Sequence, residues 1–228
     1  MVVLLAAVLL LVGALGIWFL GRSPQQMPLS EDRPLAKAAL PDRPLRIIAF
    51  GTSLTARSFW PERLATALAA CLDHPVTVER IAKPGAGSDW ALGQVGRVLE
   101  AKPDIVVIEF AINDADLFDG LSRDSSYARH LELIGRLTGG PAAPALLLMT
   151  TNPVAWGWRS LQRPRLADYY LSYRALAAET GSGLADLWPR WGAVGGDGSH
   201  PDPEAEAAIA LPVLGRLIGG RYGKDCGT

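Results

Sequence analysis

The sequence predicts a three-layer α/β/α sandwich around a five-stranded, mostly parallel sheet. With 228 residues, of which 49% are hydrophobic, the chain can bury one sizeable core. Short apolar segments alternate five times with longer segments of helical spacing, as in a doubly wound sheet. The clearest strand, residues 104–110, is apolar almost throughout, which is typical of a strand covered by helices on both faces.

Turn residues separate the predicted elements. The predicted strands are residues 46–50, 76–81, 104–110, 145–150 and 183–187. The predicted helices are residues 60–72, 89–101, 125–137, 165–180 and 203–218. The first strand ends at Gly51, as a buried strand does before a tight turn. Pro61 suits the first turn of the next helix, and Gly181 ends the fourth helix.

Residues 1–20 contain no charged side chain. A helix of about 20 residues rises ~30 Å, which is the thickness of the hydrocarbon core of a bilayer. We therefore predict a transmembrane anchor. A cleaved signal peptide is the alternative, with Ala14-Leu15-Gly16 as the cleavage site, but cleavage there leaves apolar residues 17–20 on the mature end.

The charges that flank this segment bear on its orientation. No Lys or Arg precedes it, and the basic residues that follow it are Arg22, Arg33, Lys37 and Arg43. Taken alone, the positive-inside rule places the domain in the cytoplasm. A basic segment encoded upstream would reverse this orientation. We expect a membrane-anchored, exported domain, either periplasmic or extracellular.

A Pro-rich stretch follows the apolar segment. Residues 21–44 hold five prolines and mixed charge, a composition typical of an extended tether. The chain therefore divides into the apolar segment (1–20), the tether (21–44), one folded domain (45–220) and a short tail (221–228).

Composition excludes several kinds of site. The net charge of −1 gives no sign of a nucleic-acid surface. The two cysteines, Cys71 and Cys226, exclude a disulfide framework, and neither has the His and carboxylate neighbours of a zinc site. Cys71 falls on a predicted helix and Cys226 in a Gly-rich tail, so the one bridge that the count allows is not expected.

Four polar or Gly-rich clusters follow predicted strands. They are residues 51–54, 85–88, 113–114 and 197–200. Each alone is explained by a helix cap or a turn. Because the carboxyl ends of parallel strands form the ligand crevice of an open sheet, their joint placement favours a single site at that edge.

Ser53 is the candidate nucleophile of this site. A serine hydroxyl needs a base within hydrogen-bond reach. Of the histidines, only His200 falls at the strand ends, since His74 lies in a turn predicted at the opposite edge and His130 within a helix. Asp197, three residues before His200, would orient the imidazole.

A tetrahedral intermediate also needs donors for its oxyanion. The candidates are the backbone N–H groups of Ser53 and Gly85 and the side chain of Asn113. This set suffices for acyl transfer, so we expect neither a metal nor an organic cofactor.

The four clusters resemble, in the same order, the blocks of the SGNH or GDSL-type hydrolase superfamily. Gly51-Thr52-Ser53-Leu54 resembles the Gly-Asp-Ser-Leu nucleophile block, and residues 83–88 resemble the second block. Residues 111–114 resemble the Gly-x-Asn-Asp block, and residues 197–201 match the terminal Asp-x-x-His block. The resemblance spans about residues 45–218. It implies a flavodoxin-like sandwich and a serine ester hydrolase that acts through an acyl-enzyme.

Two residues depart from the family pattern. Thr52 replaces the aspartate of the first block, and Ala111 replaces the glycine of the third. Neither change removes a catalytic group. The glycine that donates to the oxyanion is either Gly85 or Gly87, and aligning Ser88 with the hydroxyl position of the family favours Gly85.

The loop after the fourth strand holds the candidate substrate residues. Trp156 and Trp158 could stack on sugar rings, and Arg159 could meet an anionic substrate. Alternatively, the tryptophans merely cover the edge of the sheet. We expect an esterase acting on acetylated carbohydrate or small acetyl esters. The alternatives are a lysophospholipase or lipase, a polysaccharide O-acetyltransferase, and an inactive membrane-tethered binding domain.

Overall fold

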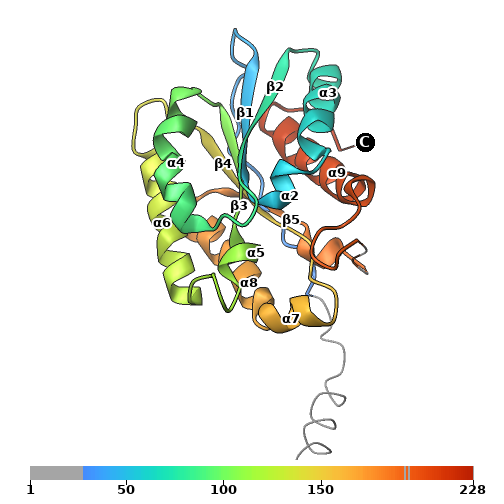
Figure 1. Ribbon diagram of the computed structural model, residues 1–228. Helices are drawn as coiled ribbons and strands as arrows, with labels where there is room; N and C mark the ends of the chain where they lie inside the picture. The colour runs from blue at the N-terminus through green and yellow to red at the C-terminus, as the bar shows by residue number, and fades with distance from the viewer. Residues whose placement is uncertain (1–27, 193, 195, 228) are drawn as a thin grey trace, which may run out of the picture.

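The computed structural model describes residues 28–192, 194 and 196–227. In this part of the chain, five parallel strands form one sheet in the order β2-β1-β3-β4-β5 (Figure 1). The strands are β1 (Leu45–Gly51), β2 (Val76–Ala82), β3 (Ile105–Glu109), β4 (Ala145–Thr150) and β5 (Gly183–Asp186). The predicted α/β sandwich is therefore confirmed, and every pairing in this sheet is parallel.

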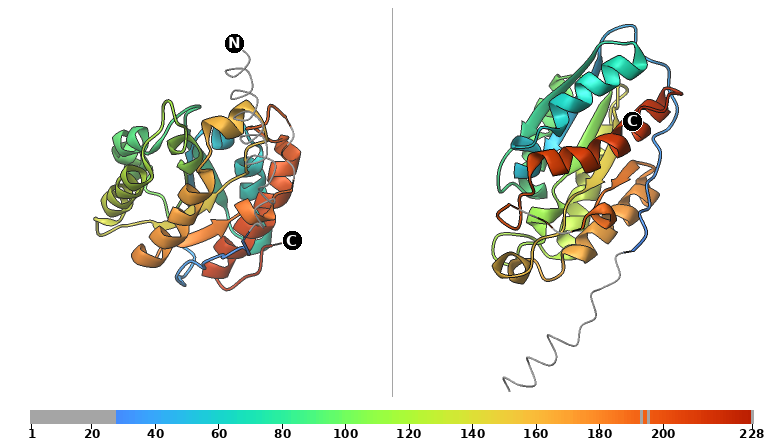
Figure 2. Two further views of the ribbon diagram at one scale, coloured as in Figure 1. Left: turned by 90° about the horizontal axis from the view of Figure 1, so that it is seen from below. Right: turned by 90° about the vertical axis from the view of Figure 1, so that its right-hand side faces the viewer.

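Helices cover both faces of the sheet. They are α2 (Ser53–Ala56), α3 (Trp60–Leu72), α4 (Ser88–Glu100), α5 (Ala111–Asp114), α6 (Arg123–Thr138), α7 (Trp158–Gln162), α8 (Leu166–Thr180), the 3₁₀ turn η1 (Trp188–Arg190) and α9 (Pro203–Arg221). α3 packs against α9 on one face, and α6 packs between α4 and α8 on the other (Figures 1 and 2). The order of the strands places β1 and β3 at the centre, where both faces are covered.

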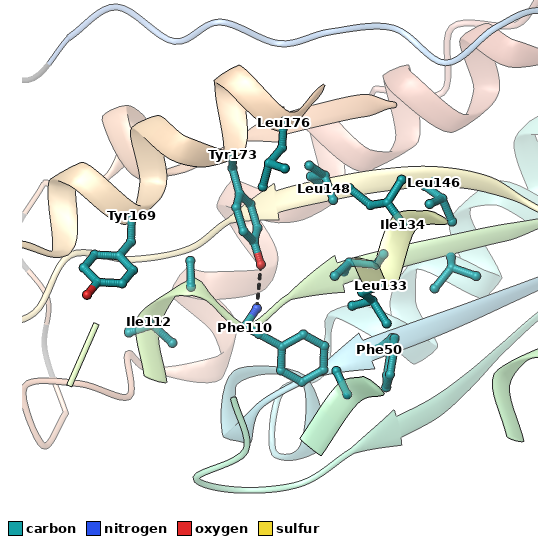
Figure 3. Packing of buried hydrophobic residues seen from close by; sticks show 14 of the residues in the cluster. Phe50, Phe110, Ile112, Leu133, Ile134, Leu146, Leu148, Tyr169, Tyr173 and Leu176 are labelled. Atoms are coloured by element: carbon teal, nitrogen blue, oxygen red, sulfur yellow. Dashed lines mark hydrogen bonds between the residues drawn. The ribbon is translucent and has the colours of Figure 1, made fainter. Parts of the chain in front are cut away.

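Two cores lie on either side of the sheet because successive strand residues point to opposite faces. In β1, Ile47 packs with the α3–α9 layer and Phe50 with the α4–α6–α8 layer. Phe50 meets Phe110 edge-to-face with 5.0 Å between ring centroids. The hydroxyl of Tyr173, on α8, accepts the Phe110 N–H at 2.9 Å (Figure 3). This bond fixes the chain where β3 passes into α5.

The prediction of a tether that does not pack is wrong for residues 28–44. Residues 30–33 bond to β5, and residues 37–38 bond to the end of α9. Arg33 and Leu184 exchange two backbone hydrogen bonds of 2.9 Å, and Leu35 is buried in the α3–α9 core. Asp32 pairs with Arg190 and Arg216. An edge strand leaves backbone groups unpaired, and an extended Pro-rich chain can still satisfy some of them. The composition of residues 28–44 does not indicate that they pack on the domain.

The expectation that Cys71 and Cys226 stay apart is also wrong, because they form a disulfide with 5.7 Å between their Cα atoms. The side-by-side packing of α3 and α9 brings the end of α3 against the chain that follows α9. That chain turns back closely, since a Cβ on Gly219 would lie 2.5 Å from the Cys226 Sγ. The tail is therefore part of the folded domain.

The predicted anchor, residues 1–20, lies outside the described residues. Among the residues that were described, no helix combines the length and the apolar character needed to span a bilayer.

Replacing both cysteines by serine should lower the free energy of unfolding by roughly 2–5 kcal/mol, because the unfolded chain regains the freedom of a long loop. The bonded residues are 155 positions apart in sequence. Urea unfolding of the wild type and of the Cys71→Ser/Cys226→Ser variant measures the change. Reductant should bring the wild type down to the stability of the variant and leave the variant unaltered. Equal stability of all four samples would contradict the prediction.

Candidate active site

A pocket of about 340 Å³ opens at the carboxyl ends of the strands. It is lined by Ser53, Gly85, Asn113, Asp197 and His200, which follow β1, β2, β3 and, for the last two, β5. The structure thus brings the five residues predicted for the triad and the oxyanion hole to one cavity. In the described part of the chain, no three His, Cys, Asp or Glu side chains are grouped as metal ligands would be.

Ser53 is the first residue of α2, directly after the turn that ends β1. The Thr52 hydroxyl caps this short helix by accepting the Leu54 N–H at 3.2 Å. The preceding Gly51 must be a glycine, because a Cβ there would lie 2.1 Å from the Glu109 carboxyl. The turn therefore rests directly on Glu109.

Glu109 is the last residue of β3 and is 1% exposed. Its carboxyl accepts the Thr52 N–H at 2.5 Å, the Thr52 hydroxyl at 3.0 Å and the Thr55 hydroxyl at 2.7 Å. Burial raises its pKa to about 7, although these three donors pull the pKa down. Thr52, which replaces the aspartate of the family pattern, is therefore part of the site, because its hydroxyl joins the turn before Ser53 to this carboxyl.

His200 lies between Ser53 and Asp197. Its Nε2 is 2.8 Å from the Ser53 Oγ, and its Nδ1 is 2.8 Å from the Asp197 Oδ2. A carboxylate can only accept, so Nδ1 carries the proton and Nε2 accepts the serine O–H. The three side chains therefore form one continuous chain of hydrogen bonds.

The loop that carries Asp197 and His200 is held in place by hydrogen bonds to the Asp197 carboxylate. The Asp197 Oδ1 accepts the backbone N–H groups of Ser199 at 2.9 Å and His200 at 2.7 Å. Desolvation raises the pKa of Asp197, but the hydrogen bonds from His200 and Ser199 outweigh it and hold the pKa well below its ordinary value. Gly196 and Gly198 have φ of +66° and +83°, which glycine adopts without strain. Asp197 thus stays ionised beside the imidazole.

Gly85 and Asn113 face Ser53 across the pocket. The Asn113 side-chain NH₂ donates to the Ala86 carbonyl at 2.9 Å, which orients the amide. Gly87 does not line the Ser53 pocket; a Cβ on Gly87 would lie 2.4 Å from the Asp114 carboxylate. Of the two candidate glycines, Gly85 is therefore the one at the nucleophile. Ala111, the other departure, is buried in the α4–α6–α8 core.

Asp114 organises the elements behind Asn113, a part that sequence reasoning did not identify. Its buried carboxylate accepts the Ser88 N–H at 2.8 Å and the Ser88 and Ser126 hydroxyls at 2.6 Å each. His130 continues this network, with Nδ1 on the Ser126 carbonyl at 2.8 Å and Nε2 on the Tyr173 hydroxyl at 2.8 Å. Burial lowers the pKa of His130, which favours the neutral ring that this bonding requires.

Of the three candidate substrate residues, only Arg159 lines the Ser53 pocket. Trp156 is 96% exposed and lies in a neighbouring hollow. Trp158 is 64% exposed and stacks on Phe118, with 6.1 Å between ring centroids. Two further arginines line the pocket and were not predicted. Arg57 lies one helical turn after Ser53 and donates its backbone N–H to the Ser53 carbonyl at 3.0 Å, whereas only the fold brings Arg163 to the pocket.

Comparison with known proteins places these features in a family. The model of the GDSL-like lipase/acylhydrolase family matches residues 48–208. A comparison with curated proteins gave no match.

Several solved structures share the fold. A mutant of an acetyl-xylooligosaccharide esterase from Geobacillus stearothermophilus is 21% identical, with a TM-score of 0.67 over 78% of this chain and 95% of that one. TesA is 20% identical, with a TM-score of 0.62 over 77% and 99% of the two chains. A lipase/acylhydrolase from Enterococcus faecalis is 22% identical, with a TM-score of 0.62 over 73% and 93%.

The family match covers most of the chain, from the β1 strand before the nucleophile turn into the first residues of α9. The chain therefore belongs to the GDSL-like lipase/acylhydrolase family and is a hydrolase of ester bonds.

Proposed function

We propose that the protein hydrolyses esters through an acyl-enzyme formed on Ser53, with His200 as the base and Asp197 as the residue that orients it. The observation that carries this proposal is the pair of 2.8 Å contacts that links Ser53, His200 and Asp197. A serine so connected can lose its proton as it attacks, which a serine that only caps a helix cannot do.

The reaction follows from this arrangement. Ser53 Oγ attacks the ester carbonyl while His200 Nε2 takes the hydroxyl proton, and Asp197 stabilises the resulting imidazolium. The N–H groups of Ser53 and Gly85 and the Asn113 amide donate to the oxyanion. His200 then gives its proton to the leaving alcohol. A water molecule repeats the sequence on the acyl-enzyme, releasing the carboxylic acid and restoring Ser53.

The proposed substrates are acetyl esters of carbohydrate or other small acetyl esters. A pocket of about 340 Å³ lies near the lower end of the range for small-molecule sites, roughly 300–1,000 Å³. Such a volume suits a short acyl group better than a long one. The likeness in fold to an acetyl-xylooligosaccharide esterase agrees with this proposal. A lipase would instead require room for a long chain outside this pocket.

The proposed setting is an exported domain held by the apolar N-terminal segment. A disulfide between Cys71 and Cys226 supports export, because such bonds persist in oxidising compartments.

Ser53→Ala should abolish labelling by a fluorophosphonate probe and lower kcat/KM on p-nitrophenyl acetate by roughly 10⁴-fold or more. His200→Ala should lower activity comparably, whereas His74→Ala, which alters a histidine outside the pocket, should not. A folded wild type that neither labels nor hydrolyses would refute the proposal. For the acyl group, p-nitrophenyl acetate should exceed the octanoate ester in kcat/KM; the reverse order would favour a lipase.

Glu109→Ala should lower the free energy of unfolding by about 2–4 kcal/mol, because buried donors of the nucleophile turn lose their acceptor. It should also lower kcat, since the turn positions Ser53. Glu109→Gln retains one carbonyl acceptor and should lose less of both. Urea unfolding and steady-state kinetics measure the two effects. Wild-type kcat in Glu109→Ala would show that the turn is held by other contacts.

The stability of the protein should also depend on the ionisation of Glu109. Its pKa rises from 4.5 in the unfolded chain to about 7 in the fold, so the folded state holds a proton that the unfolded chain releases between these values. The free energy of unfolding therefore falls as pH rises through this window. Glu109→Gln lacks this dependence, whereas the nearby buried Glu206 contributes in both proteins. Urea unfolding at pH 5 and pH 8 should show a larger decrease in the wild type.

In a host cell, the full chain should fractionate with membranes, and protease added outside the inner membrane should digest the domain. A matched chain lacking residues 1–20 should not reach the membrane fraction. Protection of the full chain until the membrane is lysed would place the domain in the cytoplasm instead.

A further inference from the structure

The Ser53 pocket has an excess of positive charge. Arg57, Arg159 and Arg163 line it, whereas Asp197 is the only acidic residue in its lining as far as the described residues go. Asp197 is already occupied by His200 and by backbone N–H groups. The described lining of the pocket therefore offers no unpaired negative charge to balance the three guanidinium groups.

Arg163 is held rigidly in this wall. Its side chain is 10% exposed, its Nε donates to the Ile112 carbonyl at 2.8 Å, and its Nη2 pairs with Asp116 at 2.8 Å. The remaining nitrogen, Nη1, is buried without a hydrogen-bond partner among the described residues. The positive charge of this guanidinium is therefore only partly compensated by its hydrogen bonds and its ion pair. Because Arg163 lines the pocket, an anion bound there would be attracted to this charge.

Arg159 lies one helical turn before Arg163 and adds to the positive electrostatic potential of the same pocket wall. Its guanidinium contacts the Gln162 side chain at 3.4 Å, and no carboxylate of the described residues forms an ion pair with it. Burial lowers the pKa of Arg163; Asp116 opposes this, and the nearby charge of Arg159 adds to it. Of these two neighbouring guanidinium groups, only that of Arg163 is paired with a carboxylate among the described residues, an arrangement that a second anion would balance.

We infer that this wall is a subsite for an anionic group of the substrate, a carboxylate or a phosphate, held by Arg163 and Arg159 while the ester lies at Ser53. This inference rests on the proposed esterase function and makes it more specific. The substrate is an ester that carries a negative charge close to the cleaved bond. Planar guanidinium groups suit both kinds of oxyanion, since each offers two oxygens to a fork of N–H donors.

Binding tests the subsite without turnover. The probes are 4-acetamidobenzoate, 4-acetamidophenyl phosphate and, as the uncharged control, 4-acetamidobenzamide. In all three an amide bond replaces the acetyl ester, and none contains a carboxylic ester. Calorimetry at low salt should show that the wild type binds at least one anion roughly fivefold or more tightly than the uncharged amide, with the difference shrinking as salt is added. Tighter carboxylate binding points to an acidic sugar, and tighter phosphate binding to a phosphorylated carrier.

Variants assign the effect to the two arginines. Arg159→Gln and Arg163→Gln should each reduce the preference for the anion, and Arg163→Lys should restore only part of it because it lacks the fork of donors. Arg165→Gln is the matched control, since Arg165 pairs with Asp168 and lies outside the pocket. Arg159 makes few contacts, so its variant remains informative if the Arg163 variants fail to fold.

Turnover separates this inference from the proposed function. For each protein we compare kcat/KM for 4-acetoxybenzoate with kcat/KM for methyl 4-acetoxybenzoate. The ratio of the first value to the second should be higher in the wild type than in Arg159→Gln. Equal binding of the anions and the uncharged amide by the wild type, or an equal loss of anion binding in Arg165→Gln, would overturn the subsite even if both esters are cleaved. Absence of cleavage and of Ser53 labelling, with the anion preference intact, would overturn the esterase mechanism and leave the subsite standing.

Discussion

The geometry of the site depends on the buried carboxyl group of Glu109. This group lies at the end of β3 and receives three donors from the turn that follows β1, the neighbouring strand. Two adjacent strand ends are thereby joined beneath Ser53, the proposed nucleophile. The close approach at Gly51 leaves no room for a side chain, and Thr52 supplies the hydroxyl that completes the contact. The position of Ser53 is therefore set by the backbone of the turn and by buried hydrogen bonds rather than by packing of the Ser53 side chain.

Asp114 plays a corresponding part on the other side of the pocket. Its carboxylate ties the start of α4 to α5, and the Ser126–His130–Tyr173 network extends this bonding to Phe110 at the end of β3. Gly85 and Asn113 belong to the two segments that Asp114 joins. Buried, fully paired polar groups are costly to disrupt, so the segments of these two proposed oxyanion donors are held in place.

The α3–α9 layer governs the third part of the site. His200 lies just before α9, and α9 is anchored by its packing on α3 and by the Cys71–Cys226 disulfide. Residues 28–44 contribute Ser30, Glu31 and Arg33 as a cover along β5, the strand before the His200 loop. Segments that composition marks as a tether and a tail thus belong to the frame that holds the proposed base, His200.

The sequence by itself determined the sandwich, the order of its elements and the candidate site residues Ser53, Asp197 and His200, because strand and turn signals are local and the four clusters follow them. Only the tertiary structure decided the Cys71–Cys226 bond, the docking of residues 28–44 and the presence of Arg163 in the pocket of Ser53. It also separated Arg159 from the two tryptophans, which lie outside that pocket. These features depend on which helix and strand surfaces meet, and such long-range packing leaves no periodic or local signal in a single chain.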